Sequence, residues 1–313
     1  MRAAHSAGIG AAAACCGLWL LSSCGARTGL VAPEAVDAAT DKPVHHDAQP
    51  DLFVEEDALP PIDVFLPDVP IFTDCPDAGS TLIYLITEEN ELLSFYPPTL
   101  GFKTIGTIAC PTTGTPFSMG VDRLGTAYSS FTTGNLFKIS TANAACQATS
   151  YVPDQKGFHT FCMGYAGQPD GGDTLYVAEC SGSPSNSLGL GWIDTTAYKL
   201  NFVGPFQPTM PSCELTGTGD GHLFGFCINP TSGSTVVQID PSNAHIVAAD
   251  PLKVGDPSNG FAFAFWGGYF WIFTTPGGTS TVTRYDPLTK TETTMTTYAG
   301  SIVGAGVSTC APE

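Results

Sequence analysis

Residues 213–243 read CELTGTGDGHLFGFCINPTSGSTVVQIDPSN, and this stretch contains the pattern that decides the fold. A short apolar segment is followed by a Gly-Asp-Gly turn, a second apolar segment, a loop, and a third segment that ends at Asp240-Pro241. Short apolar runs bounded by Gly, Pro, Asp and Asn are typical of β-strands, whereas a helix needs apolar residues every three to four positions. The stretch therefore predicts three consecutive strands.

Weaker copies of this stretch recur along the chain. Aligned on the end of the third strand, the equivalent positions are Tyr96, Ser140, Asp194, Asp240 and Asp286, with spacings of 44, 54, 46 and 46 residues. A second series, in the innermost strand of each unit, is Gly120, Gly164, Gly217, Ala264 and Gly306. A period near 45 with about four short strands per unit is typical of a β-propeller blade. We predict an all-β propeller with five blades; a degenerate sixth blade in the long 164–217 interval is the alternative.

The phase of the repeat predicts how the ring closes. The first unit begins at Thr81 with a second strand, and residues 301–310 (SIVGAGVSTC) form an innermost strand with nothing after it. We therefore predict that Ser301–Cys310 pairs with Thr81–Thr87, in the same blade as Glu91–Pro97. Such closure removes the exposed strand edges that otherwise promote aggregation.

Charge is distributed unevenly over the 313 residues, and the formal net charge is −18. Residues 34–79 carry twelve acidic residues and a single base, Lys42, whereas residues 80–313 carry seventeen acids and eight bases. Because no basic residues cluster, we expect no nucleic-acid partner and no attraction to an anionic membrane surface.

Eleven cysteines without any C-x-x-C spacing indicate an oxidising compartment rather than a zinc site or a redox-active motif. Residues equidistant from a hairpin turn face each other at a separation that suits a disulfide. The midpoint of Cys213 and Cys227 is residue 220, inside a Gly-Asp-Gly turn, and the midpoint of Cys162 and Cys180 is residue 171, inside Asp-Gly-Gly. We predict these two pairs. For the other four cysteines we favour Cys110–Cys146 and Cys75–Cys310.

Residues 1–23 have the features of a secretory signal: one arginine, an apolar stretch too short for a membrane span, and then small residues. Leu21-Ser22-Ser23-Cys24 resembles the lipobox of bacterial lipoproteins. The resemblance implies cleavage before Cys24, diacylglycerol on its thiol and a fatty acyl group on its new amino group. Gly25, in place of Asp, implies the outer membrane or cell surface. The alternatives are an ordinary signal peptide cleaved nearby, or Cys15 as the lipidated residue.

Residues 24–79 form a segment dense in Asp and Pro, which predicts a disordered acidic stalk between the lipid and a propeller at 80–313. His45-His46 has acidic neighbours and could bind a metal weakly, but we interpret it as part of the solvated stalk. The apolar residues 64–66 and 71–72 are candidates for packing along the side of the propeller.

The Asp residues at the strand ends are expected to be structural, because Asp followed by Pro suits a type I turn better than a metal site. VDRLGTAYSS at 121–130 resembles blades of secreted propellers with NHL- or YVTN-like repeats. The whole of 81–310 resembles uncharacterised bacterial lipoproteins that share the phrases ELTGTGDG and AFAFWGG. These resemblances imply fold and localisation, and they imply no activity.

Small residues in the innermost strands have a physical reason, because five strands around a narrow axis leave little room for side chains. The aromatic residues near them should pack between blades; carbohydrate stacking by one of them is the alternative. They are Phe224, Phe226, Phe263, Phe265, Trp266, Phe270 and Trp271.

Enzyme motifs are absent from the sequence: it has no G-x-S-x-G, H-E-x-x-H or P-loop. A lactonase-like, metal-assisted hydrolase would need several metal ligands at one end of the axis, and only His159, Glu214 and Asn259 fit loosely. We expect no cofactor apart from the covalent lipid on Cys24, and the sequence gives no support for a metal at the axis.

A candidate ligand site follows from the repeat, because loops leading into the inner strands all open on one face. Five residues before each small inner-strand residue lie Thr115, His159, Ser212, Asn259 and Ser301. Three residues before it lie Phe117, Phe161, Glu214, Phe261 and Val303. We predict a polar rim above an apolar throat, with Glu214 facing His159 or Asn259. The structural alternative is that Glu214 accepts backbone N–H bonds or faces solvent.

The function predicted from these features is an exported, lipid-anchored propeller that serves as a monomeric binding or interaction module at the cell envelope. Its expected partner is a small polar ligand or an envelope protein, and the sequence does not identify either. The metal-assisted hydrolase is the alternative.

Overall fold

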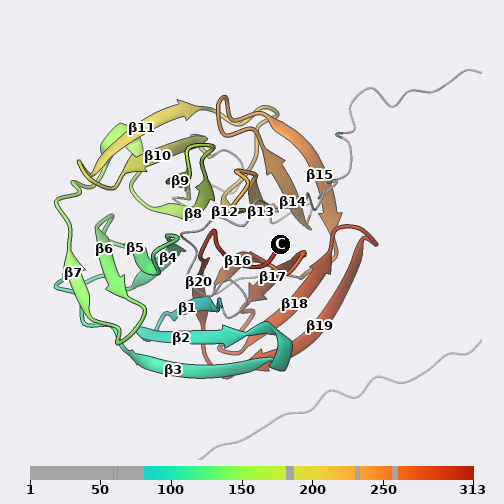
Figure 1. The fold of residues 1–313 in the computed structure, drawn as a ribbon, viewed down its shortest axis with the longest axis horizontal. Coiled ribbons are helices and arrows are strands. Elements are labelled where there is room, and N and C mark those ends of the chain that lie inside the picture. Colours follow the sequence, from blue (N-terminus) through green and yellow to red (C-terminus); the bar gives the residue numbers. More distant parts are fainter. Residues whose placement is uncertain (1–58, 60–61, 63–80, 181–186, 230–232, 256–259) are drawn as a thin grey trace, which may run out of the picture. The chain divides into compact units, whose positions relative to one another are not determined.

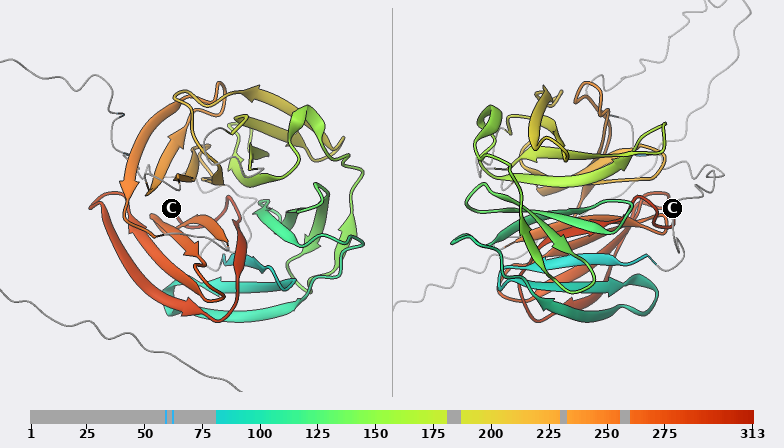
Figure 2. Two further views of the ribbon diagram at one scale, coloured as in Figure 1. Left: turned by 180° about the vertical axis from the view of Figure 1, so that it is seen from behind. Right: turned by 60° about the vertical axis from the view of Figure 1, so that its left-hand side comes forward.

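The computed structural model describes residues 59, 62, 81–180, 187–229, 233–255 and 260–313. These residues form five four-stranded antiparallel sheets, arranged as blades around a central axis (Figure 1). Figure 2 shows from behind and from the side that the blades make a continuous ring. The prediction of a five-bladed propeller is confirmed, and the long third repeat lengthens the connections in and after blade 3 instead of adding a blade.

Each blade contains four strands, ordered below from the axis outward. Blade 1 contains β20 (Ile302–Val307), β1 (Ile83–Thr87), β2 (Glu91–Tyr96) and β3 (Gly101–Thr107). Blade 2 contains β4 (Pro116–Val121), β5 (Thr126–Phe131), β6 (Leu136–Ser140) and β7 (Cys146–Ala148). Blade 3 contains β8 (Phe161–Gly167), β9 (Asp173–Glu179), β10 (Leu190–Asp194) and β11 (Lys199–Gly204). Blade 4 contains β12 (Cys213–Gly217), β13 (Leu223–Asn229), β14 (Gly233–Ile239) and β15 (Ile246–Leu252). Blade 5 contains β16 (Phe261–Trp266), β17 (Tyr269–Thr274), β18 (Ser280–Asp286) and β19 (Thr291–Tyr298). Two short 3-10 turns, η2 (Pro97–Thr99) and η3 (Gln155–Gly157), lie between strands.

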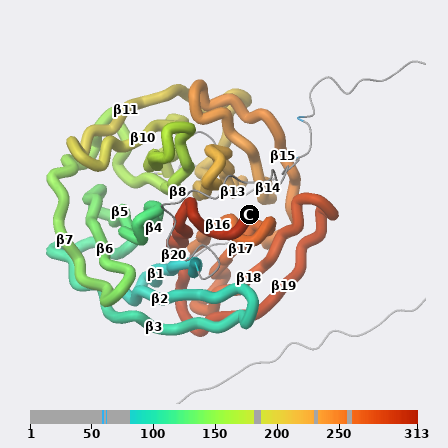
Figure 3. Tube along the Cα trace, in the orientation of Figure 1, coloured from blue at the N-terminus to red at the C-terminus, as the bar shows by residue number. Residues whose placement is uncertain are grey.

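Ring closure occurs as the phase of the repeat predicts. β20 pairs antiparallel with β1, and the register places Ile83 opposite Val307 and Thr87 opposite Ile302. The Glu88 N–H extends the pairing by donating to the Ser301 carbonyl at 2.9 Å. The tube in Figure 3 shows the C-terminal strand beside the N-terminal blade. The last strand of the chain is therefore the inner strand of the first blade.

Inner strands of neighbouring blades approach so closely that a side chain would collide with backbone. A Cβ added to Gly217 would lie 2.5 Å from the carbonyl oxygen of Tyr165, and one added to Gly164 would lie 2.6 Å from the Leu215 carbonyl. Real Cβ atoms do not approach other atoms so closely. The small residues of the repeat are thus required by the crowding around the axis.

Apolar side chains from the two faces of each blade form clusters with the next blade. Between blades 4 and 5, the Phe226 ring of blade 4 stacks with Phe263 of blade 5 with centroids 5.8 Å apart, and Phe224 meets Phe270 edge-on at 5.0 Å. Trp271 belongs to the cluster between blades 5 and 1, and Trp266 packs against the same cluster. The predicted packing of these aromatic residues between blades is confirmed.

The Asp residues at the ends of third strands hold turns. The Asp240 carboxylate accepts from the Ser242 N–H at 2.9 Å, and Asp286 accepts from the Leu288 N–H at 2.9 Å. Asp194 accepts from the Thr196 and Ala197 N–H groups. Their interpretation as turn residues is confirmed.

Three of the four predicted disulfides are present: Cys110–Cys146, Cys162–Cys180 and Cys213–Cys227. Cys213 and Cys227 are direct partners across the β12–β13 hairpin. In the β8–β9 hairpin, by contrast, the partner of Cys162 is Ala178, so the bond to Cys180 runs diagonally. Cys310 is disulfide-bonded, but Cys75 lies outside the described residues, and the fourth pairing remains a prediction. Three disulfides indicate a location outside the cytoplasm.

Two residues of the predicted stalk pack on the propeller. Ile62 is buried among side chains of blades 4 and 5, and Leu59 packs on the cluster between blades 3 and 4. The Ile62 N–H donates to Asp250 at 3.3 Å, and Lys290 donates both to the Ile62 carbonyl at 2.5 Å and to Asp250 at 2.8 Å. The rest of 24–79, with the two histidines, residues 64–66 and residues 71–72, lies outside the described residues, as does the signal segment 1–23.

We expect Gly217→Ala to lower the free energy of unfolding by about 1–3 kcal/mol, because the new methyl group overpacks the axis against backbone atoms. The control is Gly277→Ala, since nothing lies within 4 Å of a Cβ at that position. Urea denaturation of both variants measures the difference. Equal stability of the two variants would contradict the crowding argument.

Candidate functional site

One pocket opens on the axis, at the end of the ring where the chain enters the inner strands. It has a volume of about 280 Å³. β4, β8, β12, β16 and β20 each contribute at least one lining residue, which places the pocket on the axis. The described lining residues are Glu88, Thr115, Pro116, Phe117, Thr132, Cys162, Glu214, Gly260, Phe261 and Val303.

Half of the ten positions predicted from the repeat line this pocket: Thr115, Phe117, Glu214, Phe261 and Val303. The topology explains why they meet. Strands alternate in direction within each blade, so the connections that lead into the inner strands, and the turns between second and third strands, share one face. Glu88 and Thr132 come from such turns, after β1 and β5. The structure thus brings the predicted apolar throat together with one buried carboxyl group.

Glu214 is the unusual residue of the pocket, because it is an acidic side chain with an exposed fraction of only 2 %. The Ser118 hydroxyl donates to its Oε2 at 2.8 Å and accepts the Met163 N–H at 3.0 Å. Burial raises the pKa of the Glu214 carboxyl well above its ordinary value, although hydrogen bonds from Ser118 and from the Leu215 and Met163 N–H groups oppose the rise. Burial therefore favours the protonated form of the carboxyl in the unliganded pocket.

The other described positions of the ten do not line the pocket. The predicted facing of Glu214 and His159 is wrong: His159 is exposed, and its Nδ1 lies 2.7 Å from Asp154. Ser301 is buried and Ser212 half-buried, and each accepts a backbone N–H through its carbonyl group. Phe161 is fully buried and packs on Tyr151, while Asn259 lies outside the described residues. A position five residues before the small inner-strand residue lies near the start of that strand. The connections before these strands differ in length, so the side chains at this position point in different directions.

Sequence reasoning missed Ser118, Glu88 and Thr132. A signal for Ser118 exists in the repeat. The residues two positions before the small inner-strand residues are Ser118, Cys162, Leu215, Ala262 and Gly304, so Ser118 is the one hydroxyl in that series. Glu88 and Thr132 lie in the turns that connect the second strand of a blade to the third, and the residue types in these turns do not repeat from blade to blade.

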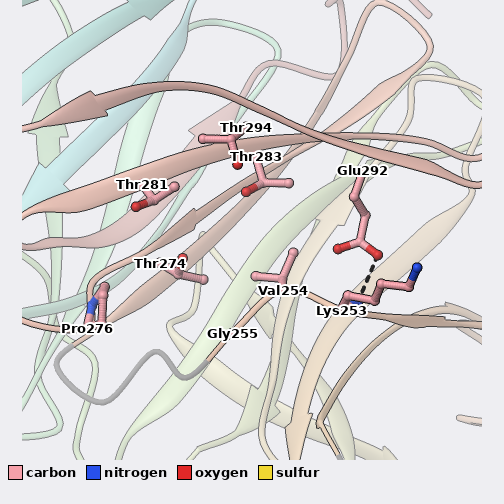
Figure 4. A pocket seen from close by; sticks show the side chains of 9 residues that line it. All are labelled: Lys253, Val254, Gly255, Thr274, Pro276, Thr281, Thr283, Glu292 and Thr294. Carbon is pink, nitrogen blue, oxygen red and sulfur yellow. Dashed lines mark hydrogen bonds between the residues drawn. The ribbon is translucent and has the colours of Figure 1, made fainter.

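A second pocket, of about 380 Å³, lies between blades 4 and 5 (Figure 4). Thr274 pairs with Thr281 across β17 and β18, and Thr283 pairs with Thr294 across β18 and β19, so four hydroxyl-bearing side chains line one wall. Lys253 and Glu292 lie at one end, where the Lys253 N–H donates to the carboxylate at 2.8 Å. The residues that correspond to Thr283 in blades 1, 2 and 4 are Leu93, Phe137 and Val237. Blade 5 is thus more polar on the wall that it contributes to this pocket.

Metal clusters and membrane-spanning helices are both absent from the part of the chain that the structure describes. Its described residues contain no group of three or more His, Cys, Asp or Glu side chains placed to hold a metal ion. No helix among them has the length and apolar character to cross a membrane.

Comparisons with known proteins find only distant similarity to solved structures. No protein-family profile matches the chain, and no curated protein matches its sequence. Among solved structures, a nidogen/laminin complex is similar at 12% identity and a TM-score of 0.47, over 72% of this chain and 97% of that chain. TolB from Acinetobacter baumannii is similar at 10% identity and a TM-score of 0.47, over 77% and 69%. The Dos1 propeller follows at 11% identity and a TM-score of 0.41, over 72% and 68%.

We expect Glu214→Gln to change how stability depends on pH. The folded protein retains the Glu214 proton above pH 4.5, the ordinary value at which the unfolded chain releases it. The free energy of unfolding should therefore fall as pH rises, by up to about 1.4 kcal/mol per pH unit, until the raised pKa is reached. Glutamine has no proton to retain, so the variant should lack this loss and be the more stable protein at neutral pH.

Urea denaturation of both proteins at several pH values measures the effect. The difference between the two curves isolates Glu214, because all other titrating groups are shared. Parallel curves from acid to neutral pH would show that Glu214 titrates normally in the folded protein.

Proposed function

We propose that this protein is an exported, lipid-anchored binding module of the cell envelope, and that its axial pocket holds a small polar ligand. One observation carries the proposal. The position of Glu214 is occupied in the other blades by Phe117, Phe161, Phe261 and Val303, so Glu214 is the one carboxyl group of that series, and it lines the pocket on the axis.

A purely structural role accounts poorly for Glu214. Its hydrogen bonds fit the structural alternative, because it accepts from Ser118 and from backbone N–H groups. An apolar residue, as in the other four blades, would avoid the cost of burying a carboxyl group at that position. A concave apolar site with few polar groups is the usual form of a small-molecule site. We therefore infer that Glu214 is retained for a ligand.

The anchor rests on the sequence alone. Leu21-Ser22-Ser23-Cys24 lies outside the described residues, and the proposal that Cys24 carries lipid is supported by its place after an apolar segment. Multiple acyl chains would hold the protein stably, since a single chain gives only marginal membrane binding. The three disulfides agree with export. We place the protein at the outer membrane or cell surface, because Gly25 follows the modified residue.

We expect Cys24→Ala to release the protein from membranes, because the variant has no thiol to receive diacylglycerol. Fractionation of cells and labelling with a radioactive fatty acid measure the change. Cys15→Ala is the matched control and should remain labelled and bound. If Cys15→Ala loses the label and Cys24→Ala keeps it, the lipid is attached to Cys15. If the wild-type protein is not labelled, the proposed lipid anchor is wrong.

We expect Val303→Trp to weaken ligand binding at the axial pocket strongly, because the larger side chain takes up part of a pocket of about 280 Å³. Saturation-transfer NMR with a panel of amines, sugars and amino acids provides the screen, and thermal shift tests divalent cations. Thr283→Val, in the pocket between blades 4 and 5, is the control and should bind as the wild type does. Binding that Val303→Trp leaves unchanged would overturn the axial site.

A further inference from the structure

Glu214 is a buried carboxyl group with no positively charged partner among the residues that the structure describes. None of the described residues that line the pocket is Lys, Arg or His. The pKa of the Glu214 carboxyl is set by burial and by hydrogen bonds from uncharged donors, and no positively charged group contributes to it. A buried charge is normally paired, so the ionised form of Glu214 lacks a counter-ion.

The groups around Glu214 are nevertheless arranged for the ionised form. The Ser118 Oγ accepts the Met163 N–H at 3.0 Å, which leaves its own hydrogen to donate to the Glu214 Oε2 at 2.8 Å. The N–H groups of Leu215 and Met163 also donate to the carboxyl. A carboxylate accepts several hydrogen bonds, whereas a protonated acid also carries a hydrogen that needs an acceptor. What the site lacks is therefore a positive charge.

The pocket walls suit a small organic cation. Phe117 and Phe261, both half-buried, line the pocket, and aromatic rings attract alkylammonium ions. Glu88, exposed at the rim, adds a second carboxylate. The volume of about 280 Å³ is at the small end for ligand sites, which limits the ligand to a few heavy atoms.

We propose that the axial pocket binds a small organic ammonium ion and that Glu214 is its counter-ion. The inference rests on the proposed function and names the ligand class of the same site. No covalent bond changes. When the cation enters, Glu214 releases its proton to solvent, and the resulting carboxylate keeps its bonds from Ser118 and the backbone N–H groups.

Binding should strengthen as pH rises, and the sign follows from the proton. In the unliganded pocket Glu214 carries a proton that it must release when the cation binds. Raising the pH toward the pKa of Glu214 makes this release less unfavourable, so the affinity for the cation increases. The neighbours of Glu214 are Ser118 from β4, Met163 and the disulfide-bonded Cys162 from β8, Phe261 from β16 and Val303 from β20. None of them changes charge, and Glu88 is the other titratable group among the described lining residues.

The test compares choline with 3,3-dimethylbutan-1-ol, its neutral carbon isostere. Choline carries a permanent charge, so any pH dependence comes from the protein. Isothermal titration calorimetry uses the full chain in nonionic detergent, in two buffers of different ionisation enthalpy at each pH. We expect choline to bind, the isostere to bind at least about tenfold more weakly, and about one proton to be released per choline at acidic pH.

Glu214→Gln keeps the shape of the side chain and removes its charge, so choline affinity should fall at least about tenfold and proton release should vanish. Thr283→Val should bind choline as the wild type does. Equal affinity for choline and the isostere, or unchanged choline affinity in Glu214→Gln, would overturn the assignment. If neither choline nor any amine binds but an uncharged compound binds in a manner that Val303→Trp blocks, the axial site stands and the ammonium class is wrong.

Discussion

Antiparallel pairing of β20 with β1 is the contact on which the ring depends. It supplies the inner strand of blade 1 from the far end of the chain, and the register is continuous from Ile83–Val307 to Ile86–Gly304. The same strand brings Val303 into the axial pocket. Beyond β20, the Thr309 hydroxyl donates to Asp173 at 2.8 Å, which also binds the buried Arg123 side chain at 3.2 Å. Closure therefore joins blade 1 to blades 2 and 3 as well as removing a strand edge.

Crowding around the axis explains why the pocket lies at one end of the ring. At the level of Gly164 and Gly217 the inner strands exclude even a methyl group. Three residues earlier along each inner strand, where the strands begin, there is room for Phe117, Glu214, Phe261 and Val303. The glycines thus close the middle of the axis and the larger residues line its mouth. A residue that is apolar in four blades and acidic in one then makes the mouth asymmetric.

Burial raises and hydrogen bonding lowers the pKa of the carboxyl groups in this protein, and their balance differs from site to site. Asp194 and Asp240 receive hydrogen bonds from turn residues much as Glu214 receives them from Ser118 and the backbone. In exposed Asp194 the Ala197 N–H lowers the pKa, and in Asp240 the Ser242 hydroxyl does so. In Glu214 burial outweighs such bonds and raises the pKa. The turn aspartates therefore stabilise their loops as anions. Burial instead favours the protonated form of Glu214, and a bound cation would favour its ionised form.

The repeat alone predicted the closing strand and the hairpin disulfide Cys213–Cys227, because each depends on spacing along the chain. It favoured five blades, and the structure excluded the alternative of a sixth blade in the 164–217 interval. It also predicted that Phe117, Glu214 and Val303 would share one face, since equivalent positions in a closed ring are equivalent in space. Only the tertiary structure showed that Ser118 binds Glu214, that His159 binds Asp154, and that Ile62 packs between blades 4 and 5. The physical reason is that periodicity specifies where a residue lies along its own strand. Contacts across the axis, or from a loop to another blade, depend on distances between segments that no spacing in the sequence encodes.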